Sequence, residues 1–161
     1  MQIAVRPATI ETRHDFSSIV EDANAWQKAL GSEGWTHPFD DVWMLPRIER
    51  GELYLAYAGA APVSAFRILW EDHPFWDDRE IGDSIYLHTF AVQRSRAGLG
   101  IGSAVIGEVV RMGRERGRAN VRLDCFRSNT RLIAFYERNG FASVGLTSMM
   151  GKAMNLMERT I

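Results

Sequence analysis

A short glycine-rich segment at residues 98–103 has the composition of an anion-binding turn. Its sequence is Gly-Leu-Gly-Ile-Gly-Ser, with Arg94 and Arg96 just before it. Glycine lets the chain turn tightly and lets a ligand approach the backbone, and the free amides and dipole of a helix N-terminus favour an anion. The segment therefore predicts a pyrophosphate cradle. A strand-to-helix turn that needs glycine only for packing remains the alternative.

Two common nucleotide-binding signatures fit this segment poorly. A P-loop ends in Gly-Lys-Ser or Gly-Lys-Thr, whereas the only lysines of the chain are Lys28 and Lys152. A dinucleotide fingerprint has glycine where this chain has Ser103, and an acidic residue at the end of the next strand, where Asp124 would have to serve. The turn also follows a fourth predicted strand and not a first. A nucleotide-binding module is therefore a weak hypothesis.

Three segments of the second half of the chain together resemble the GCN5-related N-acetyltransferase (GNAT) superfamily. They are Leu-His-Thr-Phe-Ala-Val at 87–92, Gly-Leu-Gly-Ile-Gly at 98–102, and Asn129 followed by Phe-Tyr-Glu-Arg-Asn-Gly-Phe at 135–141. The match covers about residues 84–146. The family pattern Gln/Arg-x-x-Gly-x-Gly/Ala, aligned on Gly100 and Gly102, has Ala97 at its first position, with Arg96 one residue early.

The resemblance implies acetyl-coenzyme A as the cofactor and assigns residues to it. In this family the strand before the glycine turn offers its backbone to the pantetheine arm, the turn holds the pyrophosphate, and an asparagine contacts pantetheine. Two parallel strands, here 84–92 and 120–126, splay apart to admit the cofactor. The implied cofactor-binding residues are Phe90, Ala91, Val92, Arg96, Ala97, Gly98, Leu99, Gly100, Ile101, Gly102, Ser103, Asn129 and Tyr136.

Acetyl transfer to an amine also needs an acid that protonates the leaving thiolate. A phenol with a pKa near 10 can act as that acid. Tyr136 stands where the family often places a tyrosine acid, although an aromatic residue of the core is the alternative. A backbone amide near Phe90 or Ala91 is expected to polarise the carbonyl oxygen.

His88 is the candidate general base. An amine with a pKa near 10.4 holds its proton at pH 7, and an ordinary imidazole, with a pKa near 6.5, suits its removal. Tyr86 shares a strand face with His88 by alternation and is expected to hold a water. A half-buried structural histidine explains His88 equally well. Looser candidates are Asp83, Glu80 and His73, and Asp124 is interpreted as either structural or orienting a site residue.

The acceptor is expected to be a cation. Acceptor sites in this family usually lie on the first two helices and the loop after the third strand, and here those segments combine aromatic rings with carboxylates, which suit a polyamine, an aminoglycoside-like amine or an amino-acid amine. The predicted substrate-binding residues are Trp35, Trp76, Tyr86 and His88, and no metal site is predicted. The other aromatic and acidic residues of these segments are Trp26, Trp43, Trp70, Phe39, Phe75, Asp40, Asp41, Glu71, Asp72, Asp77 and Asp78.

The composition fits one globular domain over residues 1–161. The chain has 19 basic and 20 acidic residues, with a net charge of −1. These values exclude a disordered chain and a nucleic-acid binder driven by bulk positive charge. The single cysteine, Cys125, excludes an internal disulfide and a cysteine-based zinc site. No apolar run approaches the ~18 residues of a membrane span and no signal pattern is present, so a cytoplasmic location is expected.

The near-zero net charge hides an asymmetry. Residues 1–80 contain 7 basic and 14 acidic residues and all five tryptophans, whereas residues 81–161 contain 12 basic and 6 acidic residues. We interpret the basic half as suited to an anionic cofactor and the acidic half as suited to a cationic acceptor.

Hydrophobic periodicity and turn residues predict a mixed α/β (α+β) fold. The GNAT-like expectation is a mostly antiparallel sheet of six to seven strands, with helices on both faces and one splayed parallel pair. The 84–126 unit is expected to be parallel and right-handed, and the closing strand is expected to lie exposed and able to pair with a second copy. Strands are predicted at 3–7, 52–58, 62–70, 84–92, 120–126, 141–146 and 153–159, and helices at 12–31, 41–50, 98–116 and 129–139.

The leading hypothesis is an acetyl-CoA-dependent N-acetyltransferase that acts by direct transfer on a primary amine of a small molecule or peptide. It would need no nucleic acid or membrane partner and would be a monomer or homodimer. The alternative is a catalytically inactive acyl-CoA-binding sensor or regulatory module.

Overall fold

The chain divides into two compact units. The computed structural model describes residues 2–161, apart from the side chain of Asp78. One unit contains the residues up to Ile68 together with Thr89–Glu108, and the other contains Leu69–His88 and Val109–Ile161. The strand Ser84–Val92 (β4) and the helix Ile101–Glu115 (α4) each begin in one unit and end in the other. The prediction of a single domain over residues 1–161 is not tested by this division and stays a prediction.

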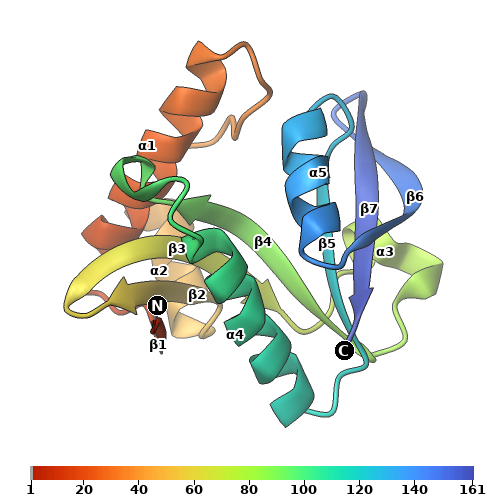
Figure 1. Ribbon diagram of the computed structural model, residues 1–161, viewed down its shortest axis with the longest axis horizontal. Helices are drawn as coiled ribbons and strands as arrows, with labels where there is room; N and C mark the ends of the chain where they lie inside the picture. The colour runs from red at the N-terminus through yellow and green to blue at the C-terminus, as the bar shows by residue number, and fades with distance from the viewer. Residues whose placement is uncertain (1) are drawn as a thin grey trace. The chain divides into compact units, whose positions relative to one another are not determined.

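The first unit is built on three antiparallel strands, β1 (Ala4–Pro7), β2 (Leu53–Ala58) and β3 (Ala61–Leu69, in this unit as far as Ile68), which lie side by side in Figure 1. It also contains α1 (Arg13–Ala29), α2 (Asp41–Glu49) and the 3-10 turn η2 (Arg94–Arg96). The apolar side of α1 supplies core residues because its apolar positions recur at helical spacing. The buried core includes Phe16, Ile19, Val20, Ala23, Phe39, Met44, Leu53, Leu55 and Ala65.

Helix α2 begins directly after its N-cap residue, Asp40. The Asp40 carboxylate accepts a hydrogen bond from the Trp43 backbone N–H at 3.0 Å, which satisfies an otherwise unpaired amide of the first turn. The helix starts at Asp41, as predicted, and runs through Pro46.

The second unit contains the first part of β4, β5 (Asn120–Phe126), β6 (Ala142–Met149) and β7 (Lys152–Thr160), with α5 (Thr130–Arg138). In Figure 1, β5, β7 and β6 lie side by side in the blue part of the chain. The segment expected to be a loop at 71–83 is partly helical, with α3 (His73–Trp76) followed by the 3-10 turn η1 (Asp77–Arg79). Pro74 stands in the first turn of α3, where its missing N–H costs nothing.

The hydrogen-bonded strands follow the order β1-β2-β3-β4-β5-β7-β6. The pairs β1–β2, β2–β3, β5–β7 and β6–β7 are antiparallel and β4–β5 is parallel. This arrangement confirms the predicted mixed sheet with one parallel pair. Within residues 2–161, no helix is long and apolar enough to cross a membrane.

The last strand is not an exposed edge. β7 pairs with β5 from Asn120↔Thr160 to Phe126↔Met154 and with β6 on its other side. Both of its hydrogen-bonding edges are therefore used, and the expectation that residues 153–159 could pair with a second copy is wrong.

The two units do not follow the two halves of the sequence. The first unit contains eight basic and ten acidic residues, and the second contains eleven basic and ten acidic residues. The charge asymmetry along the chain therefore nearly disappears in the fold, because the acidic segment 71–83 belongs to the same unit as the basic residues after position 108. The assignment of an acidic half and a basic half to two separate sites is not supported.

Candidate active site

Strand β4 carries the predicted base and the predicted backbone contacts to the cofactor, and its backbone is irregular at the residue between them. Thr89 has φ of 48°, in the left-handed region. A β-branched residue in this region is a genuine outlier, and such strain is found preferentially at functional sites. The irregularity stands directly after His88, the predicted base, and directly before Phe90, the first predicted cofactor contact.

The parallel pairing between β4 and β5 is short. Its register runs from Ser84↔Asn120 to Tyr86↔Arg122, although β4 continues to Val92 and β5 to Phe126. Among the described residues of the second unit, Leu87 and His88 therefore have no backbone partner in the register with β5. This early end of the ladder agrees with the predicted splaying of the two strands.

His88 lies between two carboxylates. Its Nε2 is 2.9 Å from Oδ2 of Asp72, and its Nδ1 is 3.6 Å from Oδ1 of Asp124. The side chains are 15%, 4% and 10% exposed for His88, Asp72 and Asp124. The first distance is a hydrogen bond in which Nε2–H donates, and the second is too long to be one. Two acids and one imidazole in so little solvent form a group that can bind or pass on a proton.

Asp72 is itself held by the segment that follows it. Its backbone N–H donates to Oε2 of Glu80 at 3.0 Å, and the other oxygen of Glu80 accepts from the Gly82 N–H at 2.8 Å. Glu80, one of the looser candidates for the base, therefore links the backbone of Asp72 to that of Gly82. Burial alone would raise the pKa of Glu80. The hydrogen bond with Tyr86 and these two backbone hydrogen bonds outweigh burial, so the pKa of Glu80 is lowered.

Asp124 is a buried carboxyl group, and its Oδ1 has no hydrogen-bond partner among the described residues. Burial raises its pKa, with a further contribution from the charge of Asp72, while the His88 charge acts in the opposite direction. The interpretation that Asp124 orients a site residue stays a prediction.

Tyr136, the predicted acid, lies in α5 and is 5% exposed. Its ring contacts Phe135 and Phe141 at centroid distances of 5.4 and 5.6 Å. Burial raises its pKa, and Cys125 and Asp124 add to the effect. The phenol therefore keeps its proton at neutral pH, which is the state that an acid needs.

Asn129 forms the N-cap of α5. Its Oδ1 accepts from the Leu132 N–H at 3.1 Å. The cap uses the acceptor atom of the amide, so the Nδ2 amino group is the donor that this side chain can offer to a ligand.

The glycine turn is exposed and follows the 3-10 turn η2. Gly98 and Gly100 have φ of 82° and 77°, and a Cβ on either would meet nothing within 4 Å. Helix α4 begins at Ile101 without an acidic residue in its first turn. Arg94 stacks on Trp26 with its Cζ 3.5 Å from the ring centroid, and its backbone N–H donates to Asp22. The turn therefore combines an open backbone with basic side chains.

Two of the predicted substrate-binding residues are core residues. Trp76 and Tyr86 are 2% and 0% exposed, and their ring centroids lie 5.9 Å apart. The Tyr86 hydroxyl accepts from Arg122 at 3.1 Å, and burial raises the pKa of Tyr86 to about 12. Side chains enclosed in this way offer no surface to an acceptor, so the structure does not support their predicted contact with substrate or with a held water.

Trp35 is half-buried in the first unit. Its backbone N–H and carbonyl pair with the side-chain amide of Asn24 at 2.8 and 3.0 Å, and its ring meets Phe39 edge-on. The remaining looser candidates are occupied elsewhere. His73 is exposed beside Glu71, and Asp83 accepts from Ser84 and Asn120.

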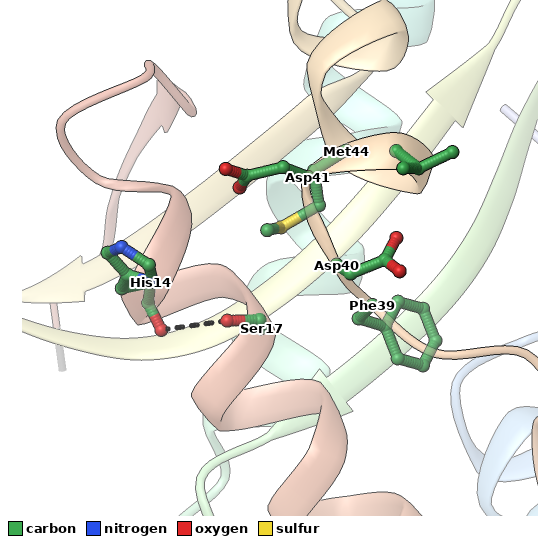
Figure 2. A pocket seen from close by; sticks show the side chains of 7 residues that line it. His14, Ser17, Phe39, Asp40, Asp41 and Met44 are labelled. Carbon is green, nitrogen blue, oxygen red and sulfur yellow. Dashed lines mark hydrogen bonds between the residues drawn. The ribbon is translucent and has the colours of Figure 1, made fainter.

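An open hollow of about 410 Å³ lies in the first unit, over the beginnings of α1 and α2 (Figure 2). Its carboxylates have structural partners, because Asp40 caps α2 and Asp41 pairs with Arg13 at 2.9 Å. None of the predicted catalytic, cofactor-binding or substrate-binding residues lines it. The lining residues are His14, Ser17, Phe39, Asp40, Asp41, Val42 and Met44.

The sequence did not single out Asp72 as the partner of His88. It stood among several carboxylates of an acidic loop, and 16 positions separate it from His88. The one local signal was the charge of Asp124 within an apolar strand, and the structure shows that this carboxyl group is buried.

The chain is similar to known acetyltransferases. The model of the Acetyltransferase (GNAT) family matches residues 18–141. The chain is 26% identical over 147 residues to the uncharacterized N-acetyltransferase YesJ of Bacillus subtilis (strain 168), which covers 86% of this chain and 81% of that protein.

Solved structures are similar over nearly the whole chain. A crystal structure of a GNAT-family acetyltransferase from Listeria monocytogenes 4b F2365 has 30% identity and a TM-score of 0.80, covering 99% of this chain and 95% of that chain. The PaiA N-acetyltransferase of Thermoplasma acidophilum, in complex with coenzyme A, has 16% identity and a TM-score of 0.75 over 100% of both chains. At this level of identity, the similarity to PaiA supports the fold of the chain alone.

Proposed function

The chain belongs to the acetyltransferase (GNAT) family, and we propose that it is an acetyl-CoA-dependent N-acetyltransferase that transfers the acetyl group directly to a primary amine of a small molecule or peptide. The observation that carries this proposal is the position of His88. The imidazole is fixed by a buried carboxylate and stands on the strand that continues into the predicted cofactor contacts.

The glycine turn fits the anionic part of coenzyme A. Its backbone is open, no acidic side chain stands in the first turn of α4, and Arg94 and Arg96 precede it. The residues proposed to hold the cofactor are those of 96–103, with Phe90, Ala91, Val92, Asn129 and Tyr136. When bound, acetyl-CoA supplies the acetyl group as an activated thioester.

His88 is proposed to take the proton from the acceptor ammonium. A primary amine with a pKa near 10.4 is almost fully protonated at pH 7 and cannot attack in that form. The hydrogen bond from Nε2–H to Asp72 leaves the lone pair of His88 on Nδ1. The imidazole is thus presented in the tautomer that can accept a proton at Nδ1.

Tyr136 is proposed to donate the proton that the leaving sulfur requires. Its pKa is raised by burial, so the donor form dominates at neutral pH. Positioned proton transfer of this kind contributes roughly 10²–10⁴-fold to a rate.

Direct transfer is supported by the state of the single cysteine. Cys125 is 4% exposed, and burial raises the pKa of its thiol to about 12. A thiol that stays protonated is a poor nucleophile, so an acetyl-cysteine intermediate is not part of the proposal.

The acceptor is proposed to be a cation, and Trp35 and His88 are kept as its proposed contacts. The carboxylates of Asp72 and Asp124 favour a positively charged amine near His88. A cytoplasmic location and a monomeric or homodimeric state without nucleic-acid or membrane partners stay predictions.

The test is a thiol-release assay with acetyl-CoA over a panel of polyamines, aminoglycosides, free amino acids and peptides with a free N-terminus. The buried Cys125 keeps the protein's own thiol background low. Release above the hydrolysis background with one class, together with the acetylated amine in the mass spectrum, supports the proposal. Calorimetric binding of acetyl-CoA without release across the panel would instead favour the inactive acyl-CoA-binding sensor.

A further inference from the structure

We propose that Asp72 and Asp124 are positioning residues for His88 and form with it a proton relay of three groups. Asp72 decides which ring nitrogen carries the resting proton, and Asp124 shares the proton that arrives on the other nitrogen. The inference rests on the proposed function, in which His88 is the base.

The hydrogen bond with Asp72 determines which nitrogen of His88 carries the resting proton. A carboxylate only accepts, so the 2.9 Å contact requires a proton on Nε2 of His88. Asp72 is 4% exposed and its backbone is held by Glu80, so this partner cannot easily move away. The ring is therefore fixed in one orientation, with the lone pair of Nδ1 directed toward Asp124.

The carboxyl group of Asp124 has one oxygen that is available to accept a hydrogen bond from His88. Oδ1 is buried, lies 3.6 Å from Nδ1 and, within the part of the chain that the structure describes, has no hydrogen-bond partner. An unpaired buried oxygen is costly, and a proton placed on Nδ1 supplies what it lacks. Burial and the charge of Asp72 raise the pKa of Asp124, so this carboxyl group is able to receive a proton from Nδ1.

Among the described residues, the groups that contact the cluster include one aromatic ring, two groups that stay protonated at neutral pH, and Glu80. From α3, Phe75 faces the imidazole at 6.3 Å between centroids. The titratable neighbours of Asp124 are Cys125 on β5 and Tyr136 on α5, and burial raises the pKa of both. Glu80 faces the backbone of Asp72.

A single metal ion fits this geometry less well than a proton does. Ligand atoms of the three residues all lie within 4.8 Å of one another. The carboxylates, however, face opposite nitrogens of one imidazole, whose in-plane directions diverge. A metal ion at Nε2 would replace the N–H that donates to Asp72, whereas a proton at Nδ1 leaves that hydrogen bond in place.

The proton transfer balances without any further reactant. One N–H bond of the acceptor ammonium breaks and a new N–H bond forms at Nδ1, which leaves a neutral amine and an imidazolium flanked by two carboxylates. The proton can then move from Nδ1 to Oδ1 of Asp124, which restores the neutral base.

The experiment compares D72N and D124N with wild type by ¹⁵N NMR of the imidazole, assigned with H88A, and by the pH dependence of kcat/KM. E115Q is the matched control, because Glu115 is an exposed carboxylate on α4 paired with Arg111. Wild type and E115Q are expected to show the Nε2–H tautomer. In D72N the amide can donate to Nε2, so the tautomer is expected to change to Nδ1–H and kcat to fall about a hundredfold or more.

D124N should act differently, because the partner carboxylate of the Nδ1–H form is lost while the ring orientation is kept. The titration midpoint of the His88 signals and the acid limb of kcat/KM should both move to lower pH, with the Nε2–H tautomer unchanged. Far-UV circular dichroism confirms that each variant is folded, and D72E serves as a second variant expected to keep the Nε2–H tautomer.

An unchanged tautomer in folded D72N, or an unmoved His88 titration in D124N, overturns the relay. Failure of the proposed function looks different, since an inactive wild-type protein would still show the tautomer change and the shifted titration in NMR. If the protein acetylates amines while H88A keeps the wild-type pH profile, the function stands and the relay is rejected.

Discussion

Replacing Arg122 by alanine should destabilise the second unit strongly. Arg122 is 6% exposed. Its Nε donates to Glu158 at 2.7 Å, its Nη1 donates to the Arg79 carbonyl at 2.8 Å and to the Tyr86 hydroxyl at 3.1 Å, and its Cζ lies 4.8 Å from the Trp76 ring centroid. Alanine removes every one of these partners at once.

The expected loss of stability follows from the burial of the Arg122–Glu158 ion pair. Removing one partner of a buried ion pair costs about 3–5 kcal/mol, because the other charge stays behind without compensation. The Glu158 side chain is 25% exposed and recovers part of its hydration, which places the expected loss near the lower end, at about 3 kcal/mol. For a chain of this length that corresponds to a Tm lower by roughly 6–12 °C.

The assay is urea unfolding followed by circular dichroism, with R111A as the matched control. Arg111 makes an exposed ion pair with Glu115 one helical turn away, and such pairs contribute only about 0.3–0.5 kcal/mol. R122M, which keeps apolar contact with Trp76 but no donors, should lose nearly as much as R122A. An R122A variant as stable as R111A would show that the buried network does not hold this unit together.

Two further predictions concern the proposed cofactor and acid. Y136F should lower kcat by about a hundredfold and change the Kd for coenzyme A far less, because phenylalanine keeps the ring proposed to contact the cofactor and removes only the acidic hydroxyl. Because burial raises the pKa of Tyr136, the phenol stays protonated to higher pH, and the wild-type rate should show no fall on the basic side below about pH 10. A fall in the rate near pH 8 would contradict the role of Tyr136. G100A should strain the turn by roughly 1–2 kcal/mol because Gly100 has φ of 77°, and calorimetry should show coenzyme A binding at least fivefold weaker. G107A, at an open position inside α4 without positive φ, should bind normally, and equal Kd values for the two variants would exclude the turn from binding.

Several elements could be predicted from local sequence. The strands at Ser84–Val92 and Asn120–Phe126 have the predicted bounds, because apolar runs between turn-forming residues leave little choice of length. Capping side chains fix the starts of α2 and α5 in the same local way. The glycine turn was visible for the same reason, since its conformation depends on residues within a few positions of one another.

Other features depend on contacts between segments that are distant in the sequence. Local periodicity does not encode such contacts. The insertion of β7 between β5 and β6 is one, and it reverses the expectation of an exposed last strand. The burial of Trp76 is another, because the acidic loop around it gave no sign that the guanidinium of Arg122 would cover its ring.

The sequence by itself determined the strands, the longer helices and their order, the glycine turn, and which residues are the candidate base and acid, but not α3. Only the tertiary structure decided that His88 would have Asp72 on one nitrogen and Asp124 on the other, 16 and 36 positions away in the chain. A residue type determines what chemistry a side chain can do, whereas its protonation and tautomer depend on the charges and solvent around it. Those surroundings exist only once the loop before α3 and the strands β4 and β5 have come together in the second unit.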